Sequence, residues 1–153
     1  MPAAQLAALR DYLGALPATR RVVLITHMVN ITALTGEARF ANHAERILGV
    51  LAPLVPRAPS GFANALAAIA LRTRGITEVA IAGDRPDLVD VVRERWRPRV
   101  VLAWGERYDS PLWNDRADGF GYVCRNYACE LPQDTLQGFA EKLTGRKVTI
   151  TGN

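Results

Sequence analysis

The amino-acid sequence predicts an α/β fold in which a small, mostly parallel sheet is flanked by helices and accompanied by an αα-hairpin. Three short apolar runs rich in β-branched residues, at 21–26, 79–83 and 100–104, are typical of strands buried on both faces. A helical pattern joins the second run to the third, which predicts a strand–helix–strand unit with a right-handed connection. Two longer helical patterns lie between the first run and the second, and these predict the hairpin.

The first half of the chain contains three predicted helices and one predicted strand. Residues 3–16 place four leucines at helical spacing, and Pro17 ends this helix before the strand at 21–26. Residues 37–55 and 60–73 each show one apolar face. A short proline-containing connection separates them, so they are expected to pack as neighbouring antiparallel helices.

In the second half of the chain, short apolar runs typical of strands alternate with patterns of helical spacing. The strand at 79–83 is followed by Pro86, which suits the first position of a helix. Residues 105–120 are rich in Gly, Asp, Asn and Pro and predict a loop. A short strand at 121–125 and a final helix at 133–143 complete the predicted elements.

Length and composition are those of an ordinary globular domain. The chain has 153 residues, of which 49% are hydrophobic and 22% are charged, and we expect a single domain. Its predicted parts are an N-terminal piece at 1–36, the helical hairpin at 37–75 and an α/β module at 76–153. No run of 18 apolar residues occurs, which predicts no membrane partner, and no signal peptide is recognisable, which favours the cytoplasm.

The formal net charge is +4, and nearly all of the positive charge comes from arginine. A basic balance can indicate a nucleic-acid partner. The arginines are scattered, however, and the densest group, at 93–99, matches no nucleic-acid-binding motif. A solvated helix end explains this group, so no nucleic-acid partner is expected.

His27 follows the first predicted strand directly. The carboxyl ends of strands in open α/β sheets are where ligands bind, so His27 is a candidate catalytic residue, and Asn30 in the following loop is a candidate ligand contact. Residues 1–36 resemble the last helix, strand and active-site loop of the histidine phosphatase superfamily. The resemblance implies that His27 helps to hold a phosphoryl group. The family's nucleophilic Arg-His-Gly motif is absent, so the alternatives are phosphate binding and a histidine with only a local hydrogen bond.

Cys124 and Cys129 form a C-x4-C pair. This spacing differs from the C-x-x-C of thioredoxin-like sites, and a zinc site would need further ligands close by. Two buried thiols are the interpretation that the sequence favours. A reactive or redox-sensing thiol pair is the alternative, and a disulfide is opposed by cytosolic reducing conditions.

Asp84 ends the second predicted strand, after Gly83. A carboxylate in such a turn can contact a ribose or a cation, or it can cap the next helix. Neither glycine-rich phosphate-binding motif, G-x-G-x-x-G or G-x-x-x-x-G-K-[ST], is present. No cofactor and no metal are therefore expected.

A second resemblance begins near residue 35 and reaches the end of the chain. It is to the C-terminal part of the thioredoxin-domain-containing, spermatogenesis-associated family, whose members join a thioredoxin-like domain to an α/α barrel of the six-hairpin glycosidase type. Four segments match in the family's order: LTGEARF at 34–40, APSGFANAL at 58–66, EVAIAGD at 78–84 and YVCRNYACELP at 122–132. The resemblance implies a C-terminal module without activity of its own, and a hairpin that is a remnant of the barrel and self-associates through its exposed face.

Both resemblances include residues 34–37. A join between two genes, an artificial chimera and a truncated reading frame are the three explanations that the sequence leaves open. Three functions follow as hypotheses: a non-catalytic module, a phosphate-binding or phosphohydrolase protein that uses His27, and a thiol redox module that uses Cys124 and Cys129.

Overall fold

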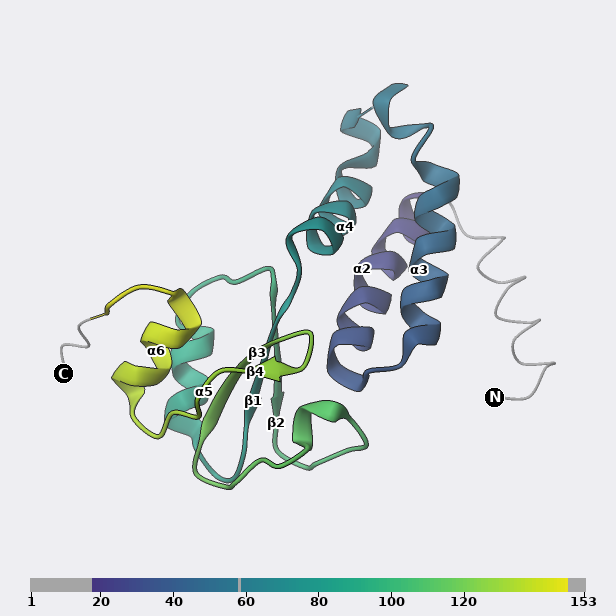
Figure 1. Cartoon of the computed structure of the whole chain (residues 1–153). Helices are drawn as coiled ribbons and strands as arrows, with labels where there is room; N and C mark the ends of the chain where they lie inside the picture. The colour runs from purple at the N-terminus through teal and green to yellow at the C-terminus, as the bar shows by residue number, and fades with distance from the viewer. Residues whose placement is uncertain (1–17, 58, 149–153) are drawn as a thin grey trace. The chain divides into compact units, whose positions relative to one another are not determined.

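The structure is a computed structural model that describes residues 18–57 and 59–148, with side chains from residue 25 onward (Figure 1). The chain forms two compact units. One contains the residues up to Val29 together with Ala38–Thr73, and the other contains Asn30–Glu37 together with the residues from Arg74 onward. The helix predicted at 3–16 lies outside the described residues.

The first unit is helical. It comprises most of α2 (Ala18–Thr35), then α3 (Ala38–Leu51) and α4 (Ala63–Arg74), with short 3₁₀ turns at Val55–Arg57 and Pro59–Phe62 between the last two. The helices α3 and α4 occupy the places of the predicted hairpin, and the carboxylate of Glu45 on α3 forms an ion pair with the guanidinium of Arg72 on α4.

The strand predicted at 21–26 is wrong, because these residues belong to α2. Short apolar runs without a clear period fit a buried strand or a buried helix equally well. The spacing beyond this run distinguishes a helix from a strand. Every fourth residue is buried, as on one face of a helix: Ile25, Val29 and Ala33.

The second unit is built on a four-stranded sheet in the order β2-β1-β3-β4. Its strands are β1 (Thr77–Ile81), β2 (Val100–Trp104), β3 (Gly121–Arg125) and β4 (Ala128–Cys129). The predicted α/β class is confirmed, but the sheet is mixed rather than mostly parallel. Only β1 and β2 run parallel, whereas β3 is antiparallel to both of its neighbours.

One face of the sheet is covered by α5 (Pro86–Arg93) and α6 (Leu136–Thr144), which lie side by side (Figure 1). The buried residues of this layer are Val79, Ile81, Leu88, Val89, Val92, Val123 and Phe139. Alternate residues of a strand point to opposite faces, so these strand positions leave the even-numbered residues of β1 for the other layer.

The other face is covered by the long connection from β2 to β3, which contains a 3₁₀ turn at Pro111–Trp113. The buried residues of this layer are Ala80, Ala82, Ala103, Leu112, Trp113, Tyr122 and Cys124. Three of them are alanines, whose small side chains let the loop lie close to the strands. The end of α2 belongs to this layer too, since Leu34 packs against the cluster.

Candidate functional site: a disulfide beside an arginine and a buried carboxyl group

A tight hairpin joins β3 to β4. Its two turn residues, Asn126 and Tyr127, have positive φ angles of 50° and 64°, as a two-residue type I′ hairpin requires. Asparagine tolerates this conformation, whereas tyrosine adopts it rarely. Tyr127 is anchored by its hydroxyl, which donates a hydrogen bond to the Thr32 carbonyl, and this bond stabilises the turn.

The hairpin places the two cysteines of the chain directly opposite each other. Cys124 on β3 pairs with Cys129 on β4, and their sulfur atoms form a disulfide. Where the sequence favoured two separate thiols, the structure therefore has one S–S bond. The four intervening residues supply one strand pair and the two-residue turn, and this arrangement brings the cysteines together.

The two sulfur atoms have different surroundings. Cys124 is 1% exposed and belongs to the core, whereas Cys129 is half-buried. The Nη2 atom of Arg116 lies 2.8 Å from the Sγ atom of Cys129. A neighbouring guanidinium stabilises a thiolate, so Cys129, the less buried of the two cysteines, is the one that a cation assists.

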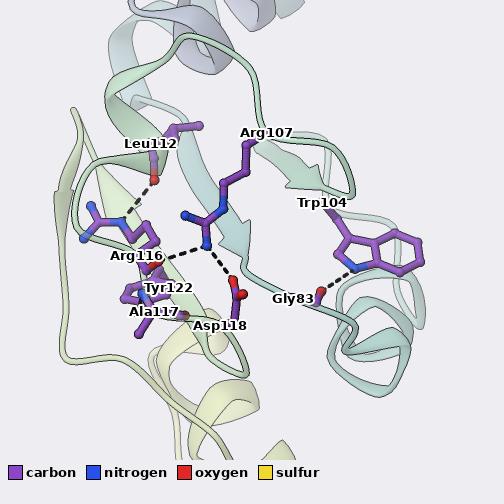
Figure 2. Close-up of polar contacts among 8 residues, drawn as sticks. All are labelled: Gly83, Trp104, Arg107, Leu112, Arg116, Ala117, Asp118 and Tyr122. Atoms are coloured by element: carbon purple, nitrogen blue, oxygen red, sulfur yellow. Dashed lines mark hydrogen bonds and ion pairs between the residues drawn. The ribbon is translucent and has the colours of Figure 1, made fainter.

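Arg116 is held in place by the loop that covers the sheet (Figure 2). Its Nε atom donates to the Leu112 carbonyl at 3.0 Å, and its guanidinium lies 4.8 Å from the centre of the Tyr122 ring. The Tyr122 hydroxyl in turn accepts a hydrogen bond from the Ala117 amide at 2.9 Å. The Leu112 carbonyl, the Tyr122 ring and the Sγ atom of Cys129 together limit the positions that the guanidinium can take.

The rest of this loop is fastened by Arg107 and Trp104 (Figure 2). The Nη2 atom of Arg107 donates to the Arg116 carbonyl at 3.0 Å and to an oxygen of Asp118 at 2.5 Å. The indole nitrogen of Trp104 donates to the Gly83 carbonyl at 3.3 Å. These bonds fix both ends of the segment that presents Arg116.

Glu78 is a buried acid on the same face of the sheet. It is 3% exposed and pairs directly with Cys124 across the β1–β3 ladder. Its Oε2 atom accepts a long, 3.5 Å hydrogen bond from the Tyr127 amide. Burial raises the pKa of Glu78 above its ordinary value, while backbone amides of the hairpin and the charge of Arg125 act in the opposite direction.

The candidate residues proposed from the supposed strand ends lie on α2 and in the turn after β1. His27 is exposed on α2 in the first unit, whereas Asn30, half-buried on the same helix, and Asp84, exposed after β1, belong to the second. The interpretation of Asp84 as a helix cap is wrong. The N-cap of α5 is Arg85, and no side chain caps this helix end.

Arg85 is fixed by other contacts. Its guanidinium forms an ion pair with Asp87 at 2.7 Å and donates to the backbone carbonyls of Gly119 and Asp134. The pKa of Asp87 is lowered, chiefly by its hydrogen bond with Arg85. In the turn after β1, the Arg85 side chain is therefore bound by groups of the chain itself.

Sequence reasoning identified the cysteine pair but missed Arg116 and Glu78. A signal for Glu78 was present, because a charged residue next to the apolar run Val79–Ala82 is unusual in a strand buried on both faces. No comparable signal exists for Arg116, whose place depends on how the loop folds.

Two features are absent from the described part of the chain. No three side chains among its His, Cys, Asp and Glu residues gather as metal ligands would. None of its helices is long and apolar enough to cross a membrane.

Comparison with known proteins finds no relative. No protein-family model, no curated protein and no solved structure matches the chain.

Proposed function

We propose that this chain is a thiol–disulfide redox module in which Cys129 is the sulfur that a partner thiol attacks and Cys124 is the sulfur that leaves, and that re-forms the disulfide in the reverse direction. The observation on which the proposal rests is the 2.8 Å contact between the Arg116 guanidinium and the Sγ atom of the half-buried Cys129. A cation beside an accessible sulfur is the environment in which cysteines are reactive, whereas cysteines buried among apolar groups are inert.

The proposed reaction is a two-step exchange with a thiol partner. A partner thiolate attacks the Sγ atom of Cys129, a new S–S bond forms between partner and Cys129, and the bond between Cys129 and Cys124 breaks with its electron pair on Cys124. A second partner thiolate then attacks the partner's sulfur in the mixed disulfide and releases Cys129 as a thiolate. In total, two partner thiols are oxidised to one disulfide and the protein disulfide is reduced to two thiols.

Arg116 affects the position of this equilibrium. Its charge stabilises the Cys129 thiolate, and a pair whose reduced form is stabilised is a stronger oxidant. The proposed module therefore accepts electrons more readily than a structural disulfide does. Structural disulfides in secreted proteins typically have potentials below about −300 mV, while the known oxidoreductases lie between about −120 and −270 mV.

The test is an equilibrium titration of the full chain in redox buffers of reduced and oxidised dithiothreitol or glutathione that reach about −300 mV. The free thiols are trapped with an alkylating reagent and counted by mass spectrometry. We expect a midpoint inside the range of oxidoreductases, with the reduced protein still folded by circular dichroism. A disulfide that still persists at about −300 mV, or a chain that unfolds on reduction, contradicts the proposal.

Arg116→Gln tests the observation itself. Loss of the cation should make the midpoint more negative, by about 30 mV for each tenfold change in the equilibrium constant. Arg95→Gln is the matched control, because Arg95 is exposed and lies in the turn between α5 and β2. An equal shift in both variants would assign the effect to net charge and not to the contact.

A second candidate is the non-catalytic module that the barrel-family resemblance implies, with self-association through the helical hairpin. Its support is the exposure of apolar side chains in the first unit, with Val50 70%, Leu66 42% and Leu54 41% exposed. Sedimentation of the parent chain and of Val50→Lys tests it. A concentration-dependent dimer that the substitution weakens is expected, and a monomer at all concentrations would exclude it.

A further inference from the structure

Glu78 is a buried acid whose desolvation outweighs the backbone hydrogen bonds and the Arg125 charge that favour its ionised form. The residue is 3% exposed, and its Oε2 atom accepts a hydrogen bond from the Tyr127 amide at 3.5 Å. Burying a carboxylate without strong partners is unfavourable, so such a group takes up a proton or has a use that offsets the loss.

The position of Glu78 points to the disulfide. Glu78 and Cys124 are direct partners across the β1–β3 ladder, so their side chains leave the sheet on the same face. Directly opposed residues of antiparallel strands have Cβ atoms about 4.5–5.5 Å apart. A glutamate side chain can span this gap itself or through one water molecule.

We propose that Glu78 exchanges a proton with the buried sulfur of Cys124 and so serves as the acid and base of the redox reaction. The inference rests on the proposed function, since it needs a disulfide that opens. When a thiolate attacks Cys129, the electron pair of the broken bond stays on Cys124. The carboxylic acid of Glu78 transfers its proton to that sulfur, which leaves a neutral thiol and a carboxylate. In the oxidising direction the carboxylate takes the proton back before the thiolate re-forms the S–S bond.

The two sulfur atoms need different help because their surroundings differ. Cys129 has Arg116 at 2.8 Å and can leave as an anion, whereas Cys124 is 1% exposed among apolar side chains. An anion confined to such a place is unfavourable, so Cys124 needs a proton when it leaves. Glu78 is the buried acid opposite it.

The surroundings of Glu78 favour the protonated form of its carboxyl group more than water does. Burial is the largest influence and raises its pKa; the amides of the hairpin turn and the charge of Arg125 on β3 lower it by less. The pKa of the Tyr127 phenol is raised chiefly by burial and then by the charge of Glu78. From β2, the paired position is the apolar Val101.

The experiment compares disulfide reduction by dithiothreitol in the parent chain and in Glu78→Gln across a range of pH. Glutamine has the same shape and still accepts the Tyr127 amide, but it cannot give a proton. We expect the variant to be reduced about 10²-fold more slowly at low pH, the lower end of what general acid catalysis contributes. The ratio of the two rates should then approach one as pH rises and the parent Glu78 loses its proton. Use of the ratio cancels the ionisation of dithiothreitol itself.

Glu94→Gln is the matched control, because Glu94 is exposed at the end of α5, and it should follow the parent chain. A ratio that stays constant with pH would show that Glu78 only shapes the site and would overturn the inference. So would equal rates for the parent chain and Glu78→Gln.

Failure of the inference can be told apart from failure of the proposed function. A parent chain that resists reduction throughout contradicts the redox function itself; a parent chain that is reduced readily, with a pH-independent ratio, contradicts only the role of Glu78. Carbon-13 NMR of the Glu78 carboxyl group gives a readout that does not depend on rates. Its titration should differ between the oxidised and reduced protein, and an identical titration in the two states would count against proton exchange with Cys124.

Discussion

Gly121 on β3 lies where the sheet has no room for a side chain, which makes Gly121→Ala a sharp test of the packing. An added Cβ atom would lie 2.6 Å from both Cδ2 and Cε2 of the Phe139 ring and 3.2 Å from a methyl group of Leu88. The strand cannot easily move away, because Gly121 exchanges two backbone hydrogen bonds with Gln133, at 2.8 and 2.9 Å. Phe139 is fully buried and has nowhere to retreat.

The size of the effect follows from these distances. Carbon atoms pack best at about 3.5–4.0 Å, so the ring and the new methyl group must separate by about 1 Å. Overpacking of this kind costs about 1–3 kcal/mol. The stiffer alanine backbone returns about 0.5–1 kcal/mol. We therefore expect the free energy of unfolding of the second unit to fall by about 1–2 kcal/mol, at roughly 4–8 °C in Tm for each kcal/mol in a unit of under 100 residues.

Urea denaturation of Gly121→Ala, Phe139→Leu and the double variant measures the interaction directly. Phe139→Leu alone should be destabilising, but the smaller side chain should make room for the alanine. The double variant should then lose less than the sum of the two single losses, by about 1 kcal/mol. An alanine variant as stable as the parent chain, or strictly additive losses, would refute the reasoning.

Three other outcomes are expected. Gly49→Ala in α3 should raise the free energy of unfolding of the first unit by about 0.5–1 kcal/mol in urea denaturation, because nothing lies within 4 Å of the added methyl group. Ser110→Ala should lower that of the second unit by about 1–3 kcal/mol in the same assay, since the buried hydroxyl donates to the Leu34 carbonyl at 2.5 Å and accepts from the Leu112 amide at 3.2 Å. The raised pKa of Glu78 means that the folded state keeps this proton at pH values where the unfolded chain has lost it. Stability should therefore decline as pH rises from about 4.5 through the folded pKa, and a Glu78→Gln variant should lack this part of the decline.

Most elements that the sequence predicted occur in the structure. The hairpin helices and the helix after Pro86 each have one apolar face, whereas the strands near 79–83 and 100–104 are short apolar runs that the structure shows as β1 and β2. The run at 21–26 was too short to separate strand from helix, and only the spacing that continues through Ala33 identifies α2.

The pairing of the strands was harder to predict. The run at 121–125 was recognisable, but its antiparallel place beside β1 depends on a long loop whose path leaves no local pattern. The two-residue β4 has no period at all, and its turn, Asn126-Tyr127, lacks the glycine that usually indicates such a hairpin.

The same distinction applies to the site. Cys124 and Cys129 could be identified by residue type, but their S–S bond depends on the hairpin register. Arg116 reaches Cys129 only because the loop folds back over the sheet, so its role is a product of tertiary structure. The candidates His27, Asn30 and Asp84 depended on the expectation that strand ends meet. The strand expected at 21–26 is part of the helix α2 instead.

The last residues of α2 have a consequence for how this sheet could be moved between proteins. Residues 30–37 belong to the second unit, where the Thr32 and Leu34 carbonyls accept bonds from Tyr127 and Ser110, yet the rest of that unit begins only at Arg74. A genetic exchange that transferred the chain from Arg74 onward as one cassette would leave both hydroxyl groups without their acceptors and part of the sheet uncovered. The sheet and the cysteine pair are therefore inherited intact only if the helical segment between the two pieces is inherited with them.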